Sequence, residues 1–209
     1  MNSSYIEKNI FLYYSTGMKR RTAHETIKAI TITASMGALI IVMGLTHIGF
    51  IPWFSGASIT IMQIPVILAA LIAGKYSGLG TGLIFGIFSL IQAAIAPIGP
   101  LDPFFVNPLI SILPRCLMGL CAFWCFAFFN KFPKFPKIAN YAISGLFASI
   151  VNTCLVLLML VVFKAIDFKM FIAVFVANGL LEAAASAVIT TIVMTLITMP
   201  KKKSKFSDA

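Results

Sequence analysis

Long apolar runs, separated by short polar segments, occupy most of this chain. A helix that spans a lipid bilayer needs about 20 mostly apolar residues, and runs of about this length recur along the sequence. The pattern therefore predicts six membrane-spanning helices, at about 27–46, 58–73, 77–96, 104–129, 138–163 and 170–199. The connection THIGFIPWFSGAS at 46–58 is apolar but contains glycines, a proline and a tryptophan, which is typical of an interfacial or re-entrant loop.

The composition indicates an integral membrane protein. Hydrophobic residues make up 60% of the 209 residues and charged residues only 11%, which is too little polar surface to cover a soluble core. We expect an all-α integral membrane protein with one membrane domain over 1–209. It would comprise an N-terminal segment at 1–26, the six-helix bundle at 27–199 and a basic tail at 200–209. The polar N-terminal segment does not fit a signal peptide, so the first apolar run is expected to stay as a helix.

The basic residues predict the orientation in the membrane. Of the 16 Lys and Arg residues, all but Arg115, Lys164 and Lys169 lie in the terminal segments or in the connections that would share a side with them. Lys and Arg in short loops accumulate on the cytoplasmic side, so both termini are predicted to be cytoplasmic. The net charge of +10 then follows from topology, and we expect no nucleic-acid partner.

Neither catalysis nor metal binding is indicated. The sequence contains no Ser/His/Asp set, no HExxH motif and no paired carboxylates, and it contains no P-loop for ATP. Cysteines occur only within apolar segments, without an accompanying His or acid, and are interpreted as packing residues; they are Cys116, Cys121, Cys125 and Cys154. We therefore expect no catalytic residue, no metal and no cofactor bound by this chain.

Small residues recur at helical spacing in two places. Gly74, Gly78, Gly82 and Gly86 follow one another every four residues, which lets a second helix approach closely. Packing within the bundle is the favoured interpretation of this row. Ala34, Gly37 and Ala38 form a similar face on the first helix, which could pack internally or meet a partner subunit.

Three polar side chains are predicted at one depth in the membrane. Arg115, Asn152 and Glu182 each lie about 11 or 12 residues from the outer end of their helix, which is about 16–18 Å at 1.5 Å per residue. Ionisable side chains in the hydrocarbon region usually face a protein interior or a cavity and mark function. Arg115 could hold a carboxylate or phosphate through two hydrogen bonds.

Further polar residues extend this set toward the outer surface. Asn107 and Ser111 precede Arg115 at four-residue spacing, and Asn178 precedes Glu182 in the same way, so each row shares one helix face. Gln63 and Gln92 are expected at shallower levels. The sequence thus predicts a substrate pocket that is open to the outside, with the connection at 46–58 as a candidate lid. The predicted site residues are Arg115, Asn107, Ser111, Asn152, Asn178, Glu182, Gln63 and Gln92.

Two other features bear on this pocket. Pro103, Pro108 and Pro114 should loosen the outer half of the fourth helix and free backbone groups for a ligand. The alternative to a pocket is that Arg115 and Glu182 merely neutralise each other as an interhelical pair, and a pair and a pocket can also coexist.

The run ITIMQIPVILAALIAGKYSGLGTGLIFGIFSLIQAAIAP, continued by PFFVNPLISILPRCLMGL, resembles the substrate-binding S components of energy-coupling factor (ECF) vitamin transporters. The resemblance implies a six-helix S-component bundle in the plasma membrane of a prokaryote. It also implies capture of a vitamin or related micronutrient and docking on a transmembrane T subunit with two ATPases, which bind the ATP. Ala34 to Ala38 matches the AxxxA pattern by which such proteins dock, and transport in this family involves toppling of the S component.

The quoted segment is most similar to the pantothenate branch of the family. The chain departs from that branch in two respects. It has Gln63 where a His often stands, and it lacks the longer insertion that those proteins tend to have between their third and fourth helices. Riboflavin is the second candidate ligand. Two other functions remain open from the sequence. A stand-alone ion-coupled secondary transporter would move its solute without ATPases, and a structural membrane subunit would bind no small molecule.

Overall fold

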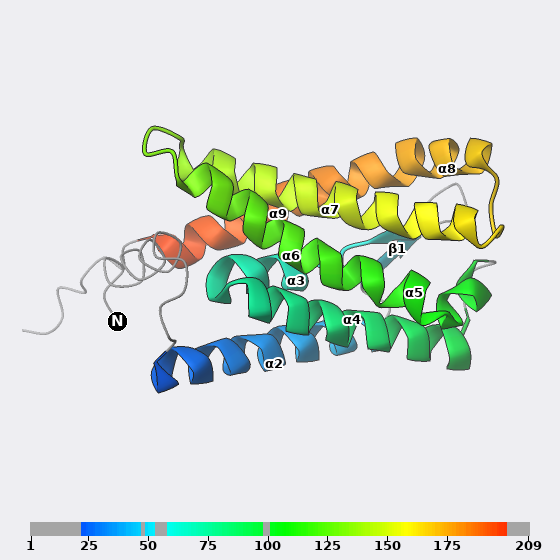
Figure 1. Ribbon diagram of the computed structural model, residues 1–209, viewed down its shortest axis with the longest axis horizontal. Helices are drawn as coiled ribbons and strands as arrows, with labels where there is room; N and C mark the ends of the chain where they lie inside the picture. The colour runs from blue at the N-terminus through cyan, green and yellow to red at the C-terminus, as the bar shows by residue number, and fades with distance from the viewer. Residues whose placement is uncertain (1–21, 47–48, 53–57, 98–100, 200–209) are drawn as a thin grey trace, which may run out of the picture.

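A computed structural model describes residues 22–46, 49–52, 58–97 and 101–199. Its elements, in chain order, are helix α2 (Ala23–Leu45), strands β1 (Phe50–Pro52) and β2 (Ser58–Thr60), helices α3 (Gln63–Ala73) and α4 (Lys75–Ile95), the 3-10 helix η1 (Asp102–Val106), helices α5 (Pro108–Ser111), α6 (Leu113–Asn130), α7 (Lys137–Val162) and α8 (Phe168–Val174), the π-helical turn η2 (Phe175–Gly179) and helix α9 (Leu180–Thr198). Figure 1 shows them as a bundle of helices along one long axis.

Five helical segments in the described ranges are long and apolar enough to cross a membrane. They are α2, α4, α5 with α6, α7, and α8 through α9. Large apolar side chains are exposed along their outer faces, among them Leu39, Leu83 and Ile192, as expected where lipid replaces water. The chain is therefore a multi-pass membrane protein. The first, third, fifth and sixth predicted helices begin within about four residues of their predicted positions, whereas the second and fourth differ.

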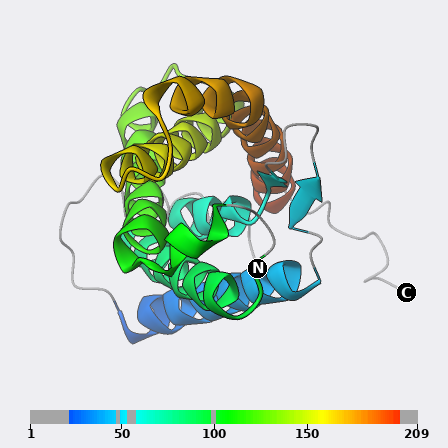
Figure 2. The ribbon, with the colours of Figure 1, turned by 90° about the vertical axis from the view of Figure 1, so that its right-hand side faces the viewer.

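Helix α3 occupies the centre of the bundle. It contacts α2, α4, α6, α7 and α9, and Figure 2 shows it inside the ring that these helices form. Every residue from Gln63 to Leu71 is buried, which suits a helix that is apolar on all sides. At 11 residues it is shorter than the about 20 needed for a full span, so its first turn lies inside the protein.

The second predicted helix begins later than its apolar run. Residues 58–60 form β2, which pairs antiparallel with β1 so that Phe50 is opposite Thr60. The prediction that the helix begins at residue 58 is therefore wrong. Extended residues advance about 3.3 Å each and helical ones only 1.5 Å, so the strand carries the chain to Gln63 at a deeper level than a helix would. Residues 47–48 and 53–57 of the candidate lid lie outside the described residues.

The prolines divide the fourth predicted helix as expected. Pro103, Pro108 and Pro114 each stand in the first turn of a new element, η1, α5 and α6 respectively. Proline is tolerated there because the first turn needs no amide donor. The predicted run at 104–129 therefore consists of two short helical pieces, η1 and α5, followed by the regular helix α6.

The glycine row packs α4 against the broken helix. A Cβ at Gly78 would lie 2.8 Å from the Gly119 carbonyl oxygen, and one at Gly86 would lie 2.7 Å from Ile112 Cα. Gly82 faces the backbone of Arg115 in the same way. Internal packing, the favoured interpretation of this row, is confirmed. The contact at Gly82 also sets the position of Arg115 along the length of α4.

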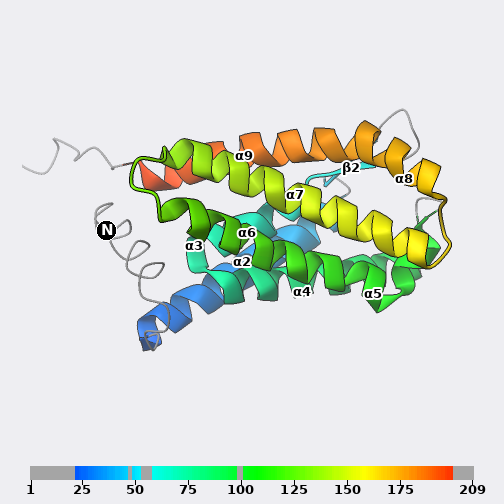
Figure 3. The same ribbon diagram turned by 45° about the horizontal axis from the view of Figure 1, so that its top comes forward.

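Two groups of chain segments mark the two ends of the bundle. The first turn of α2, the connection between α6 and α7, and the last turn of α9 lie together at one end (Figure 1). The connection between α7 and α8 lies at the other end, together with η1 and α5 (Figures 1 and 3). The predicted N-terminal segment up to residue 21 and the basic tail at 200–209 lie outside the described residues.

Candidate binding site

Most of the predicted site residues are buried polar side chains in the interior. Gln63, Ser111, Arg115, Asn152, Asn178 and Glu182 are all buried. Asn107 and Gln92 are only half-buried. Buried polar atoms in an apolar protein need partners, since each unsatisfied atom costs free energy. The partners of each side chain therefore tell which residues serve the fold and which retain unused hydrogen-bonding capacity.

The amide of Gln63 connects three helices. Its Nε2 donates to Ser149 Oγ at 2.7 Å and to Ser186 Oγ at 3.0 Å, and its Oε1 accepts from Asn152 Nδ2 at 3.3 Å. These partners lie on α7 and α9, while Gln63 opens α3. Gln63 is therefore level with Asn152, and its predicted shallower position is wrong because strand β2 carries the chain inward.

The carboxylate of Glu182 forms a second group beside the first. Its Oε1 accepts from the backbone N–H of Thr60 at 2.7 Å, and its Oε2 accepts from Thr153 Oγ1 at 3.2 Å. The π-helical turn η2 directly precedes it and contains the buried Asn178. Such turns are frequent at functional sites.

Arg115 is held by the break that Pro114 creates. In a regular helix the carbonyl of Ile110 would accept from the N–H of residue 114, but proline has none. Arg115 Nη1 donates to this carbonyl instead, at 2.6 Å. The guanidinium carbon lies 5.1 Å from the centre of the Phe105 ring and 5.5 Å from that of Phe85. The charge is thus stabilised by two aromatic rings, through cation–π attraction.

Two predicted wall residues serve the local backbone. Asn107 Oδ1 caps α5 by accepting from the N–H of Leu109 at 3.0 Å, and Ser111 Oγ donates to the carbonyl of Phe105. Both side chains satisfy backbone groups at the proline breaks. Gln92 lies near the end of α4 and forms none of the hydrogen bonds that connect the buried groups around Gln63 and Glu182.

Two polar atoms of this region have no hydrogen-bond partner. Within the described residues, Arg115 Nε and Asn152 Oδ1 are buried and unpaired. One is a donor and the other an acceptor, so together they offer complementary groups to a bound molecule. The hydroxyls of Thr81 and Thr190 are also unpaired, but neither is among the residues that bond around Gln63 or Glu182.

Arg115 and Glu182 do not neutralise each other by direct contact. Each is occupied by other partners, and among the described residues the two side chains form no ion pair. They lie close enough to attract each other electrostatically. The alternative of a simple interhelical pair is therefore not what the structure contains, and the guanidinium keeps a free donor.

Several residues of the site were not predicted from the sequence. Ser149, Thr153 and the backbone N–H of Thr60 hold Gln63 and Glu182. Serine and threonine are common in membrane helices, so composition alone does not single them out. Helical spacing could have found one of them, because Ser149 lies three residues before Asn152 and so on the same face of α7.

The small-residue face of α2 lies away from this region. Ala34 and Ala38 are exposed, whereas Gly37 is buried, and a Cβ there would lie 2.6 Å from Ile84 Cδ1. Gly37 therefore packs within the chain. A place for Gly37 in a partner interface does not fit this burial. The predicted small-residue face combined residues from two sides of the helix, the exposed side with Ala34 and Ala38 and the buried side with Gly37.

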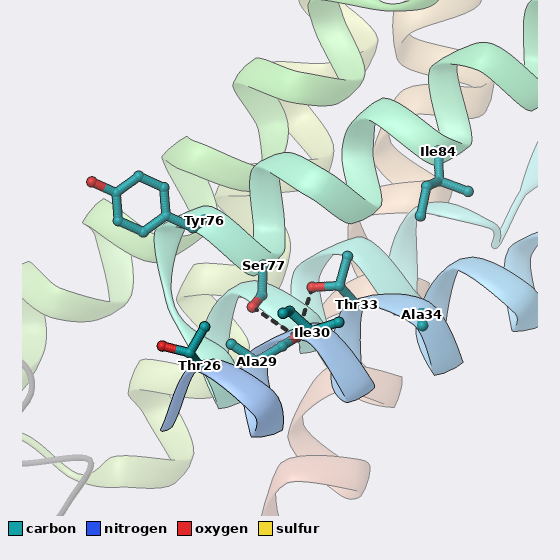
Figure 4. A pocket seen from close by; sticks show the side chains of 8 residues that line it. All are labelled: Thr26, Ala29, Ile30, Thr33, Ala34, Tyr76, Ser77 and Ile84. Atoms are coloured by element: carbon teal, nitrogen blue, oxygen red, sulfur yellow. Dashed lines mark hydrogen bonds between the residues drawn. The ribbon is translucent and has the colours of Figure 1, made fainter. Parts of the chain in front are cut away.

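A shallow groove of about 360 Å³ lies between α2 and α4, next to this face. Figure 4 shows its lining, with Ser77 Oγ donating to the Ala29 carbonyl at 3.4 Å and Thr33 Oγ1 to the same carbonyl at 2.8 Å. These bonds satisfy the hydroxyls within the chain. The groove is lined by Thr26, Ala29, Ile30, Thr33, Ala34, Tyr76, Ser77 and Ile84.

No metal centre is found in the described ranges, where no three His, Cys, Asp or Glu side chains come together. The four cysteines are free and half-buried in α6 and α7.

Comparison with known protein families identifies the family to which the chain is similar. The sequence profile of a protein family described as the substrate-specific component of ECF transporters matches residues 28–199. This stretch runs from the first turns of α2 to the end of α9 and includes all the buried polar residues described above. No curated protein matches the chain.

Proposed function

The chain belongs to the family of substrate-specific components of ECF transporters, and we propose that it binds a vitamin or related micronutrient at Arg115 and Asn152 and delivers it to its partner subunits. Members of this family are binding subunits of a transporter, so the chain is a membrane transport protein and not an enzyme. The observation that carries the proposal is the pair of buried, unpaired atoms, Arg115 Nε and Asn152 Oδ1.

The chemistry of Arg115 favours a ligand with an acceptor group. A guanidinium between two aromatic rings keeps its planar set of donors in a fixed direction, and such a group binds carboxylates and phosphates well. Pantothenate is the first candidate because it carries a carboxylate and because the segment from α3 to the start of α6 resembles the pantothenate branch. Riboflavin is the second candidate. Asn178 and Glu182 would complete the site around the ligand, and Gln63 would hold Asn152 in place.

The proposed orientation puts the first turn of α2 and the last turn of α9 on the cytoplasmic side of a prokaryotic plasma membrane. Lys28, Lys75, Lys131, Lys134 and Lys137 belong to segments at that end of the bundle, and basic residues accumulate on the cytoplasmic side. The ligand would then enter from the end formed by α5 and the connection between α7 and α8.

Docking on a T subunit with two ATPases is proposed for the face of α2. Ala34 and Ala38 are exposed there and leave room for a partner helix to approach closely. ATP would be bound by the ATPases, and this chain would bind no cofactor.

Titration calorimetry tests ligand binding. The purified chain is titrated with pantothenate and with riboflavin, and one of them is expected to bind tightly and in a one-to-one ratio. Uptake into cells should need the T subunit and the ATPases in addition. If neither vitamin bound, the proposed ligands would be wrong, and uptake without ATPases would favour a secondary transporter.

Bulky substitutions on α2 test docking separately. The double variant Ala34→Leu, Ala38→Leu should keep ligand affinity but lose uptake and co-purification with the T subunit, because only the docking face is obstructed. Ala184→Leu is the control, since Ala184 is likewise exposed, on α9. A double variant that still co-purified with the T subunit would show that docking uses another surface.

A further inference from the structure

The chain of hydrogen bonds around Gln63 fixes which atom of Asn152 is left for a ligand. Gln63 Nε2 has two hydrogens, and both are used by Ser149 and Ser186. Its Oε1 therefore points the other way, toward Asn152, and accepts from Asn152 Nδ2. An amide nitrogen and oxygen lie on opposite sides of their carbon, so the oxygen of Asn152 is turned away from Gln63.

This oxygen is buried and unpaired. Asn152 is only 9% exposed, and its Oδ1 has no partner among the described residues. Both oxygens of Glu182, by contrast, already accept hydrogen bonds, from Thr60 and Thr153. Asn152 Oδ1 is thus an acceptor that only a ligand donor, or water, can satisfy.

The neighbouring helix presents the opposite chemistry. Arg115 is 7% exposed and its Nε is an unpaired donor, and α6 packs directly against α7. A ligand that filled both requirements would place an acceptor at Arg115 and a donor at Asn152. A buried group that is left unpaired penalises binding, so the site should discriminate strongly against molecules that lack either one.

We propose that this site selects ligands that combine a carboxylate or carbonyl, bound by Arg115, with a hydroxyl or amide N–H, which donates to Asn152 Oδ1. Gln63 is the positioning residue that sets the direction of the Asn152 amide without touching the ligand. The inference rests on the proposed function and adds the substrate class: small carboxylate or carbonyl compounds that also carry a neutral hydrogen-bond donor.

The test compares ligands that differ by one donor. Pantothenate and riboflavin are titrated into the full chain, together with analogues of each in which one hydroxyl is replaced by hydrogen or one N–H by oxygen. For the vitamin that binds, removal of one particular donor should weaken wild-type binding by about tenfold or more, while removal of the others should have smaller effects.

Variants then assign that donor to Asn152. In Asn152→Leu the parent vitamin should bind about tenfold more weakly, and the sensitive analogue should lose nothing further, since the acceptor is gone. Gln63→Leu should reduce the ratio between parent and analogue, because Asn152 is no longer held in one direction. Asn140→Leu is the matched control on the same helix and should keep the wild-type ratio.

The outcomes separate the two proposals. If a vitamin binds but no analogue is weakened, or if Asn152→Leu discriminates as well as the wild type, the selection at Asn152 is wrong while the binding function stands. If neither vitamin binds, the proposed ligands and this inference are overturned together.

Discussion

Helix α7 carries two buried asparagines whose surroundings differ in one respect. Asn140 Nδ2 donates to the carbonyl of Phe126 at 3.1 Å, and its Oδ1 accepts from Ser144 at 3.2 Å. Asn152 Nδ2 donates to Gln63 at 3.3 Å, but its Oδ1 is unpaired. Both side chains are deeply buried, so burial alone does not distinguish them.

The difference separates structural from binding residues. At Asn140 both ends of the amide are used within the chain: the nitrogen joins α7 to α6, and the oxygen pairs with Ser144 on α7 itself. At Asn152 one end is left over, and Arg115 on the next helix also keeps a free donor. A polar residue inside a membrane protein therefore indicates a ligand site when its hydrogen-bonding capacity exceeds what the fold uses.

Removing the guanidinium should have the largest effect. Arg115→Ala is expected to weaken ligand binding by about tenfold to a hundredfold, the range for hydrogen bonds to a charged group. The variant should still fold, because it also removes a buried charge. Calorimetry on the purified variant measures the loss. Unchanged affinity would remove Arg115 from the site, and Arg115→Lys tests whether the planar donor set matters beyond the charge.

Moving Arg115 without changing it should have an intermediate effect. A Cβ at Gly82 would lie 2.9 Å from the Arg115 carbonyl carbon and 3.2 Å from Cys116 Cα, and these backbone atoms can only yield if α6 shifts. Gly82→Ala should therefore destabilise the protein by about 1–3 kcal/mol and weaken ligand binding several-fold.

Gly80→Ala is the control for this variant, because the nearest atom to its Cβ is a side-chain methyl of Thr33 at 3.1 Å. Thermal unfolding and calorimetry measure both effects. Equal behaviour of the two alanine variants would mean that the contact between α4 and α6 does not position the site.

The smallest effect on ligand binding is expected at Asn140, whose amide is fully hydrogen-bonded within the chain. Asn140→Leu should lower the free energy of unfolding by about 0.6 kcal/mol, the average for hydrogen bonds between membrane helices, and should leave ligand affinity unchanged. Thermal unfolding of the ligand-free chain and calorimetry give the two numbers. A clear loss of affinity in this variant would contradict the distinction between the two asparagines.

The helices and the level of the buried polar residues could largely be predicted from the sequence. Apolar run lengths predicted the five helical segments long enough to cross a membrane, but not that the second of the six predicted spans is a helix of only 11 residues. The prolines predicted the breaks before α6. The short strand β2 was missed because Ser58, Ile59 and Thr60 continue an apolar run, and only their pairing with β1 distinguishes them from a first helical turn. The level of Gln63 was wrong for the same reason.

The roles of the polar residues were harder to predict, because they depend on which partners are left over. The sequence shows the same kind of side chain at Asn107 and Asn152, yet the first caps a helix and the second keeps a free oxygen. One contact was accessible in principle. Pro114 stands four residues after Ile110 and frees its carbonyl oxygen, to which the guanidinium of the adjacent Arg115 donates.

The proposal that this chain is a vitamin-binding subunit is tested most directly by identifying the small molecules that stay bound to the purified protein. The purified chain is incubated with an equimolar mixture of water-soluble vitamins, desalted and analysed by mass spectrometry, beside Arg115→Ala. We predict that the wild type retains one vitamin at about one molecule per chain, a compound with both a carboxylate or carbonyl and a hydrogen-bond donor, and that the variant retains much less. Retention of no vitamin, or equal retention by both proteins, would contradict the account.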